Sequence, residues 1–204
     1  SSSISAEPYP FEFIPAKCAL LIIDMQRDFL EAGGFGEMLG NDVSQLRRTI
    51  EPNRRLLAAW RAAGLRVIHT REGHRPDLAD LPPEKKIRGR SAKAIGDPGP
   101  MGRILIRGEA GHDITPELYP LPDEPVIDKP GKGAFFATDL HAILQNLGIT
   151  QLVVTGVTTE DCAAGVGPCL TLRFTMPQTT SVTFPDGLAG PAEVTQRPGH
   201  HPPG

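Results

Sequence analysis

Two apolar runs limit what this 204-residue chain can fold into more than any other feature of its sequence. They are CALLII at residues 18–23 and the run at the centre of QLVVTG, residues 151–156. A strand with one face in water alternates apolar and polar residues. A strand in a parallel sheet is covered on both faces and reads as continuously apolar. Both runs are therefore predicted to be buried strands of a parallel sheet.

Other strand and helix patterns alternate along the chain between these two runs. Apolar residues recur three to four apart from residue 43 to residue 60, with Pro52 inside the pattern, which predicts a kinked helix or two shorter helices. The alternation predicts an α/β fold, a doubly wound and mainly parallel sheet with helices on both faces in three layers. The remaining predicted elements are strands LRVIHT (65–70), ILI (104–106) and PVID (125–128) and the helix TDLHAILQNLG (138–148).

The two ends of the chain differ in character from its centre. Residues 1–14 are predicted to be an N-terminal extension, and residues 15–162 a single α/β domain. Residues 163–204 contain 7 Pro and 6 Gly and form an atypical C-terminal segment, predicted to be partly disordered. Within this segment, LTLRFT (170–175) and TTSVTF (179–184) are weak candidates for edge strands.

Composition excludes several classes of protein. Charged residues make up 22% of the chain with a net charge of -3, and no basic cluster suggests a nucleic-acid partner. No apolar run approaches the ~18 residues of a membrane span. Three cysteines give no disulfide framework and fit a reducing compartment, so a cytoplasmic protein is expected. His69 and His74 are not accompanied by further metal-ligand motifs, so no metal site is expected. No phosphate-binding glycine motif is found either, and no cofactor is expected.

Three reactive side chains follow predicted strands. Asp24 follows residues 18–23, Lys129 follows residues 125–128, and Cys162 ends the stretch GVTTEDC after residues 151–156. The carboxyl ends of parallel strands meet at one edge of a sheet, which is where α/β proteins place their chemistry. We therefore expect these three side chains to lie near one another.

Each of the three also has an ordinary structural interpretation. Cys162 could be a small buried side chain, Asp24 a cap on the next turn, and Lys129 an exposed lysine. In the functional interpretation Cys162 is a thiolate nucleophile and Asp24 a general base or an orienting group. Lys129 then lowers the pKa of the thiol or holds the carboxylate in its charged form, and Lys132 competes for that role.

Three stretches of sequence carry a resemblance to a known family. ALLIIDMQRDFL, VIDKPGKGAFFATDL and LVVTGVTTEDC resemble the isochorismatase-like cysteine hydrolases, and HTREGHRPDL with IGDPGPMGRILIRGEAGHDI resembles their biuret and triuret hydrolase branch. The resemblance implies that Asp24 is the base, Lys129 the positioning cation and Cys162 the nucleophile. It also implies an oxyanion hole formed by the amides of Thr158 and Cys162. Aromatic residues that could form walls of the pocket, although such residues more often belong to the core, are Phe29, Phe135 and Phe136.

The activity that the resemblance implies is cleavage of a C–N amide bond in a small, biuret-like ureide. A covalent thioester intermediate would form and ammonia would be released, in a homo-oligomer of two or four chains. One alternative is an inactive family member, because AAGVGPC follows Cys162 where the family has a helix. Another is an isochorismatase-type vinyl-ether hydrolase, although those enzymes do not rely on the cysteine.

Overall fold

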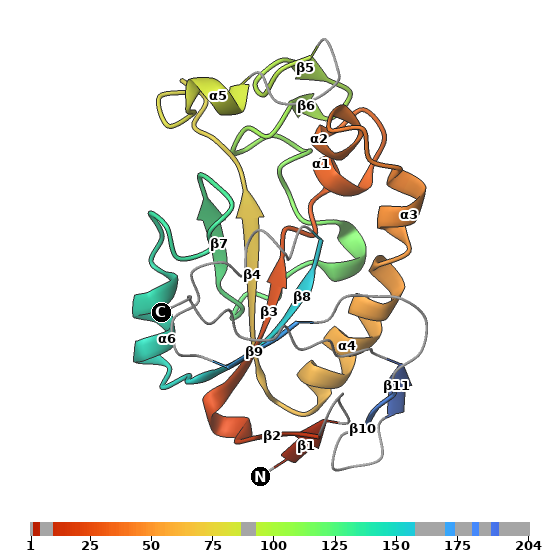
Figure 1. Ribbon diagram of the computed structural model, residues 1–204, viewed down its shortest axis with the longest axis vertical. Helices are drawn as coiled ribbons and strands as arrows, with labels where there is room; N and C mark the ends of the chain where they lie inside the picture. Colours follow the sequence, from red (N-terminus) through yellow and green to blue (C-terminus); the bar gives the residue numbers. More distant parts are fainter. Residues whose placement is uncertain are drawn as a thin grey trace, which may run out of the picture.

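The central element of the computed structural model is a five-stranded sheet in which every neighbouring pair of strands is parallel (Figure 1). The structure describes residues 2–4, 10–86 and 93–157 together with three short strands at 170–173, 181–183 and 189–191. Across the sheet, the strands are β7 (Val126–Lys129), β4 (Arg66–Glu72), β3 (Cys18–Ile23), β8 (Gln151–Gly156) and β9 (Leu170–Arg173).

Helices cover both faces of this sheet, and α4 (Ile50–Ala62) and α6 (Leu140–Asn146) lie on opposite sides of the strands in Figure 1. Leu20 and Ile22 of β3 pack into the core on the α4 side with Trp60. The alternate residues of β3, among them Leu21, pack into the core on the α6 side with Leu144. Because both faces of β3 are covered, its sequence is apolar throughout, and the predicted three-layer α/β fold is confirmed.

The predicted division of the helix around Pro52 is confirmed. Two helices form, α3 (Val43–Arg47) and α4 (Ile50–Ala62), with the break before the proline. Pro52 is the third residue of α4, where the amide has no acceptor within the helix, so its missing N–H costs nothing.

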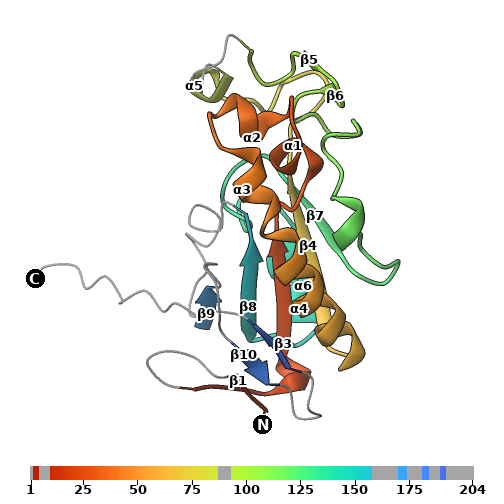
Figure 2. The same cartoon turned by 90° about the vertical axis from the view of Figure 1, so that its right-hand side faces the viewer.

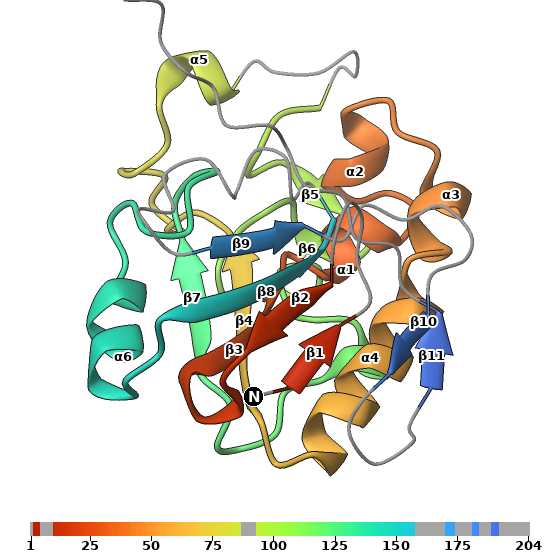
Figure 3. The same cartoon turned by 60° about the horizontal axis from the view of Figure 1, so that its bottom comes forward.

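A hairpin precedes the sheet and lies at the end of the molecule opposite the strand tips (Figure 1). When that end is turned toward the viewer, the hairpin lies in front of the sheet (Figure 3). Its strands are β1 (Ser2–Ile4) and β2 (Phe11–Phe13), which pair antiparallel. Phe13 is buried and its ring stacks on that of Trp60 with 5.9 Å between centroids. The aromatic side chains of β2 therefore contribute to the core on the α4 side of the sheet.

Short elements gather beyond the carboxyl ends of the strands, as Figures 1 and 2 both show. These are α1 (Arg27–Leu30), α2 (Phe35–Met38), α5 (Pro83–Lys86), β5 (Pro98–Gly99) and β6 (Gly102–Arg103). The remaining elements are the 3-10 turns η1 (Pro15–Lys17) and η2 (Pro116–Leu118) and the paired strands β10 (Ser181–Thr183) and β11 (Ala189–Pro191). No helix within the described parts of the chain is long and apolar enough to cross a membrane.

The predicted strand at residues 104–106 is wrong. Leu105 has a φ of +56°, which a strand does not allow, and its amide donates to the carboxylate of Asp28 rather than to a neighbouring strand. Its carbonyl oxygen accepts from the amide of His74. The apolar side chains of this segment are buried because the loop is held down by these separate partners.

The tip of β8 lies against the tip of β3. Gly156 has a φ of +125°, and a Cβ added there would lie 2.1 Å from the carbonyl oxygen of Ile23. The next amide, that of Val157, donates to this same carbonyl at 3.1 Å. Glycine at this position therefore allows β8 to reach its end beside the residue that precedes Asp24.

We predict that Gly156→Ala lowers the free energy of unfolding by about 2–5 kcal/mol, because backbone strain adds to a steric clash. Gly148 is a matched control, since it also has a positive φ, +65°, but nothing lies within 4 Å of an added Cβ. Gly148→Ala is expected to cost only about 1 kcal/mol, from the strain alone. Urea denaturation measures both, and equal losses would show that the contact with Ile23 is unimportant.

Candidate active site

A buried ion pair joins Asp24, which follows β3, to Lys129, the last residue of β7. The Nζ atom of Lys129 lies 2.7 Å from Oδ2 of Asp24, and both side chains are fully buried. Thr70 lies on β4, between those two strands, and its hydroxyl donates to Oδ1 of Asp24 at 2.6 Å. The structure therefore brings Asp24 and Lys129 together at the edge of the sheet where the sequence places them.

Lys129, and not Lys132, supplies the cation of this pair. The side chain of Lys129 is buried, whereas Lys132 is exposed and presents its backbone carbonyl to Nζ of Lys129 at 3.4 Å. The carbonyl of Gly131 accepts from the same ammonium at 3.0 Å. Asp24 has a φ of +50°, an uncommon conformation for a residue other than glycine and one often found at functional positions.

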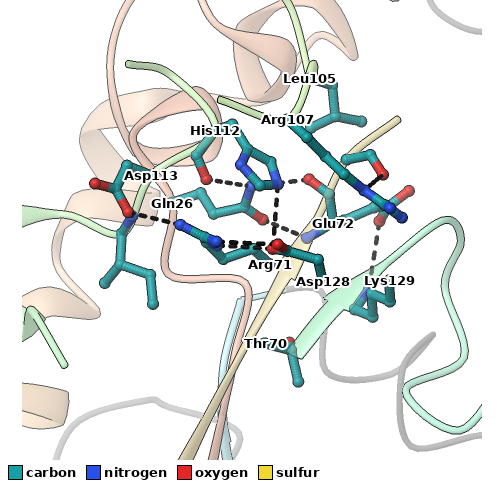
Figure 4. Close-up of polar contacts among 12 residues, drawn as sticks. Gln26, Thr70, Arg71, Glu72, Leu105, Arg107, His112, Asp113, Asp128 and Lys129 are labelled. Carbon is teal, nitrogen blue, oxygen red and sulfur yellow. Dashed lines mark hydrogen bonds and ion pairs between the residues drawn. The ribbon is translucent and has the colours of Figure 1, made fainter. Parts of the chain in front are cut away.

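Glu72 is a third charged member of the site, which the sequence analysis missed. It is the last residue of β4, and its Oε2 lies 3.6 Å from Nζ of Lys129 (Figure 4). Its other oxygen, Oε1, contacts the ammonium of Lys85 on α5. The strand predicted at 65–70 ended two residues short of β4, which left Glu72 outside the set of side chains at strand ends.

The two buried carboxyl groups differ in their pKa. Burial raises the pKa of Asp24 above its usual value, although Lys129 opposes that shift. Burial also favours the protonated form of Glu72, but the charges of Lys129 and Lys85 outweigh it and hold the pKa of Glu72 below its usual value. Asp24 is therefore better suited to exchange a proton near neutral pH, while Glu72 is suited to remain an anion.

A polar network fastens the loop of residues 105–114 above these strand ends (Figure 4). Arg71 makes a two-pronged contact with Asp128, its cross-strand partner on β7, and also pairs with Asp113. The side-chain amide of Gln26 donates to the backbone carbonyls of Glu72 and His112, and its oxygen accepts from the amide of Glu72. This network fixes the end of β4, and with it the side chain of Glu72.

Cys162 and Thr158 lie outside the described residues, so their expected roles remain predictions. In the sequence they follow Val157, whose amide is bonded to the carbonyl of Ile23, next to Asp24. Cys18 is fully buried within β3, and burial raises its pKa to about 12, as expected for a cysteine without a chemical role.

The three candidate wall residues do not come together. Phe29 is buried in the core on the α4 side and packs edge-on against Phe35, 5.6 Å between centroids. Phe135 packs against the core on the α6 side, the opposite face of the sheet, and Phe136 is 70% exposed. Phe29 has the environment of a core residue, and a role in substrate binding for any of the three stays a prediction.

The two histidines considered as metal ligands have separate surroundings. His69, in the middle of β4, contacts Glu124 at 3.0 Å, whereas His74, beyond the end of β4, contacts Lys85. Among the residues that the structure describes, no group of three or more His, Cys, Asp or Glu side chains is arranged to hold a metal ion.

Comparison with protein families identifies the fold that carries this site. Residues 18–164 match the model of the isochorismatase domain. The chain belongs to the isochorismatase domain family. The match includes both members of the buried ion pair and extends through Cys162.

Individual relatives agree with this assignment. The chain is 31% identical over 164 residues to the ureidoacrylate amidohydrolase RutB of Serratia proteamaculans (strain 568), covering 78% of this chain and 66% of that protein. It is 32% identical over 163 residues to RutB of Yersinia enterocolitica, covering 78% and 71%. A cysteine hydrolase from Pseudomonas syringae pv. phaseolicola 1448A has a similar structure, with a TM-score of 0.60, 25% identity and coverage of 74% and 64%. The chain thus spans about two thirds of the length of these relatives.

We predict that Lys129→Met lowers the free energy of unfolding by about 3–5 kcal/mol at pH 8, because it leaves the buried carboxylate of Asp24 without its cation. The loss is expected to shrink toward pH 5. Without Lys129 the folded-state pKa of Asp24 rises further above its unfolded value, so the folded protein gains stability as protons bind.

Denaturation of this variant at several pH values measures the effect, with Lys132→Met as the matched control. Lys132 is exposed and lies only three residues away, so its variant is expected to lose much less stability than Lys129→Met at pH 8. A loss for Lys129→Met that did not vary with pH would contradict the assignment of Asp24 as its buried partner.

Proposed function

We propose that this protein is a cysteine amidohydrolase that cleaves a C–N bond of a small ureide. The observation that carries the proposal is the buried pair of Asp24 and Lys129 at 2.7 Å, on a family domain whose sequence places Cys162 just after β8. Val157, whose amide is bonded to the carbonyl next to Asp24, lies at the same edge of the sheet, and Cys162 comes five residues later in the sequence.

In the proposed mechanism, Asp24 accepts the proton of the Cys162 thiol, and the sulfur attacks the carbonyl carbon of the ureide. The amides of Thr158 and Cys162 donate to the oxyanion that forms. The C–N bond then breaks, and Asp24 returns its proton to the departing nitrogen, which leaves as ammonia. Asp24 next takes a proton from water, the resulting hydroxide attacks the thioester, and the sulfur recovers that proton as the C–S bond breaks.

The raised pKa of Asp24 supports its part in this mechanism, because a general base acts best when its pKa lies close to the working pH. Lys129 keeps the carboxylate accessible in its charged form despite complete burial. A small ureide is proposed as substrate on the names of the curated relatives, which are amidohydrolases of ureidoacrylate, and on the resemblance to biuret hydrolases. The homo-oligomer stays a prediction.

The test is ammonia release from a panel that contains biuret, triuret and a ureido acid. We expect turnover of at least one member and a loss of roughly a thousand-fold or more in Cys162→Ala, as for other removed nucleophiles. Cys169→Ala is the matched control, since it removes a cysteine seven residues along the chain and is expected to keep full activity.

Unchanged turnover in Cys162→Ala would overturn the covalent mechanism. If no ureide reacts, the rate of Cys162 alkylation is measured against pH, because this reports the pKa of the thiol without any substrate. A midpoint near the ordinary thiol value of about 8.5 would then identify an inactive member of the family.

A further inference from the structure

Lys85 is the basic residue whose position the proposed mechanism leaves unexplained. It belongs to α5, a single turn beyond the carboxyl end of β4, yet its side chain is only 12% exposed. The next residue, Lys86, is exposed in the usual way. A lysine that buries its ammonium gives up hydration, so the interactions that replace the lost water indicate what it does.

Three acceptors converge on the ammonium of Lys85. Oε1 of Glu72 is in close contact, Nε2 of His74 lies at 2.8 Å, and the carbonyl oxygen of Pro130 lies at 3.3 Å. An ammonium has three N–H donors, so the number of acceptors matches. These acceptors come from the end of β4 and from the turn after β7, so Lys85 joins α5 to both.

His74 takes part as a neutral acceptor. Its Nε2 can accept from Lys85 only if the ring proton is on Nδ1, which lies 3.3 Å from Oδ1 of Asp80. Burial, followed by the charge of Lys85, lowers the pKa of His74 and favours this neutral form. Asp80 is in turn 3.8 Å from Arg107.

Four side chains therefore form a row of alternating charge from the interior to α5. Asp24 pairs with Lys129, Lys129 contacts Glu72, and Glu72 contacts Lys85. The formal charges of this row cancel. Without Lys85, the anion of Glu72 would be left with only Lys129 among these partners and would compete with Asp24 for its ammonium.

We propose that Lys85 is a positioning residue of the active site, which neutralises Glu72 so that Lys129 remains paired with Asp24. This inference rests on the proposed function. Lys85 does not touch Asp24 in this arrangement, because Glu72 and Lys129 stand between them. The ammonium of Lys85 also lies between Glu72 and His74. These two side chains therefore already bind a cation, that of Lys85.

The first measurement compares the free energy of unfolding of Lys85→Met and Lys86→Met between pH 4 and pH 8. In the folded protein the pKa of Glu72 is lowered, so it contributes stability that is present above its unfolded value and is lost as pH falls. Removing Lys85 raises that pKa. The deficit of Lys85→Met is therefore expected to be largest at pH 8 and to shrink toward pH 4, whereas Lys86→Met behaves like the unmodified protein.

A role for Lys85 that does not involve the charge of Glu72 would produce a deficit that does not vary with pH. A structural ion pair without a role in the site is distinguished by the pH profile of the reaction, which it would leave in place. The double variant Glu72→Gln/Lys85→Met checks the partner, because with Glu72 neutral the loss of Lys85 should lose its dependence on pH. The inference would be overturned if the stability deficit of Lys85→Met did not vary with pH. It would also be overturned if that deficit kept its dependence on pH when Glu72 is replaced by Gln.

The second measurement is the pH profile of ureide hydrolysis and of Cys162 alkylation. With one cation fewer, both are expected to move to higher pH by about one unit in Lys85→Met and to stay in place in Lys86→Met. An active unmodified protein with an unmoved profile in Lys85→Met overturns this inference alone. If the unmodified protein shows no turnover, and its Cys162 is alkylated with the pH midpoint of an ordinary thiol, the proposed function is overturned. The positioning role of Lys85 is then overturned with it.

Discussion

The contact between Asp24 and Lys129 is the interaction on which the arrangement of this molecule depends. Each charge is removed from water completely, which costs several kcal/mol per ion unless a partner compensates for it. The partners lie at the ends of two strands, β3 and β7, that are not neighbours in the sheet, and β4 between them supplies Thr70. The pair is therefore tolerated only while three strands keep their register, and the core on both faces of the sheet provides that rigidity.

Two carboxyl groups, those of Asp24 and Glu72, lie close to the ammonium of Lys129, and the site gives them different pKa values. Glu72 receives a second cation from Lys85, and Asp24 receives a hydroxyl from Thr70. One carboxyl is thereby held as an anion and the other is left able to change its protonation state. This division leaves Asp24 as the carboxyl group of this pair that is able to exchange a proton, as the proposed mechanism requires.

The sequence predicted the strands and the meeting of Asp24 with Lys129 well, because continuous apolar runs and the geometry of parallel sheets are local and general rules. It did not predict Glu72 or Lys85. Lys85 lies in a loop-rich region without periodicity, and its burial depends on acceptors contributed by β4 and by the turn after β7. The wrong strand at 104–106 has a similar cause, since the buried carboxylate of Asp28 satisfies a backbone amide that a strand would otherwise pair.

The position of β3 between β4 and β8 has a consequence for the synthesis of this protein. β4 begins 43 positions after the end of β3, and β8 begins a further 79 positions after the end of β4. At roughly 5–20 residues per second, a ribosome needs about 4–16 s to make that stretch. Throughout this interval one edge of β3, a strand with only apolar side chains, has no strand to pair with, and such an edge can pair with other chains. The nascent chain therefore still exposes one edge of β3 after β4 has emerged, and it needs chaperone protection until β8 arrives.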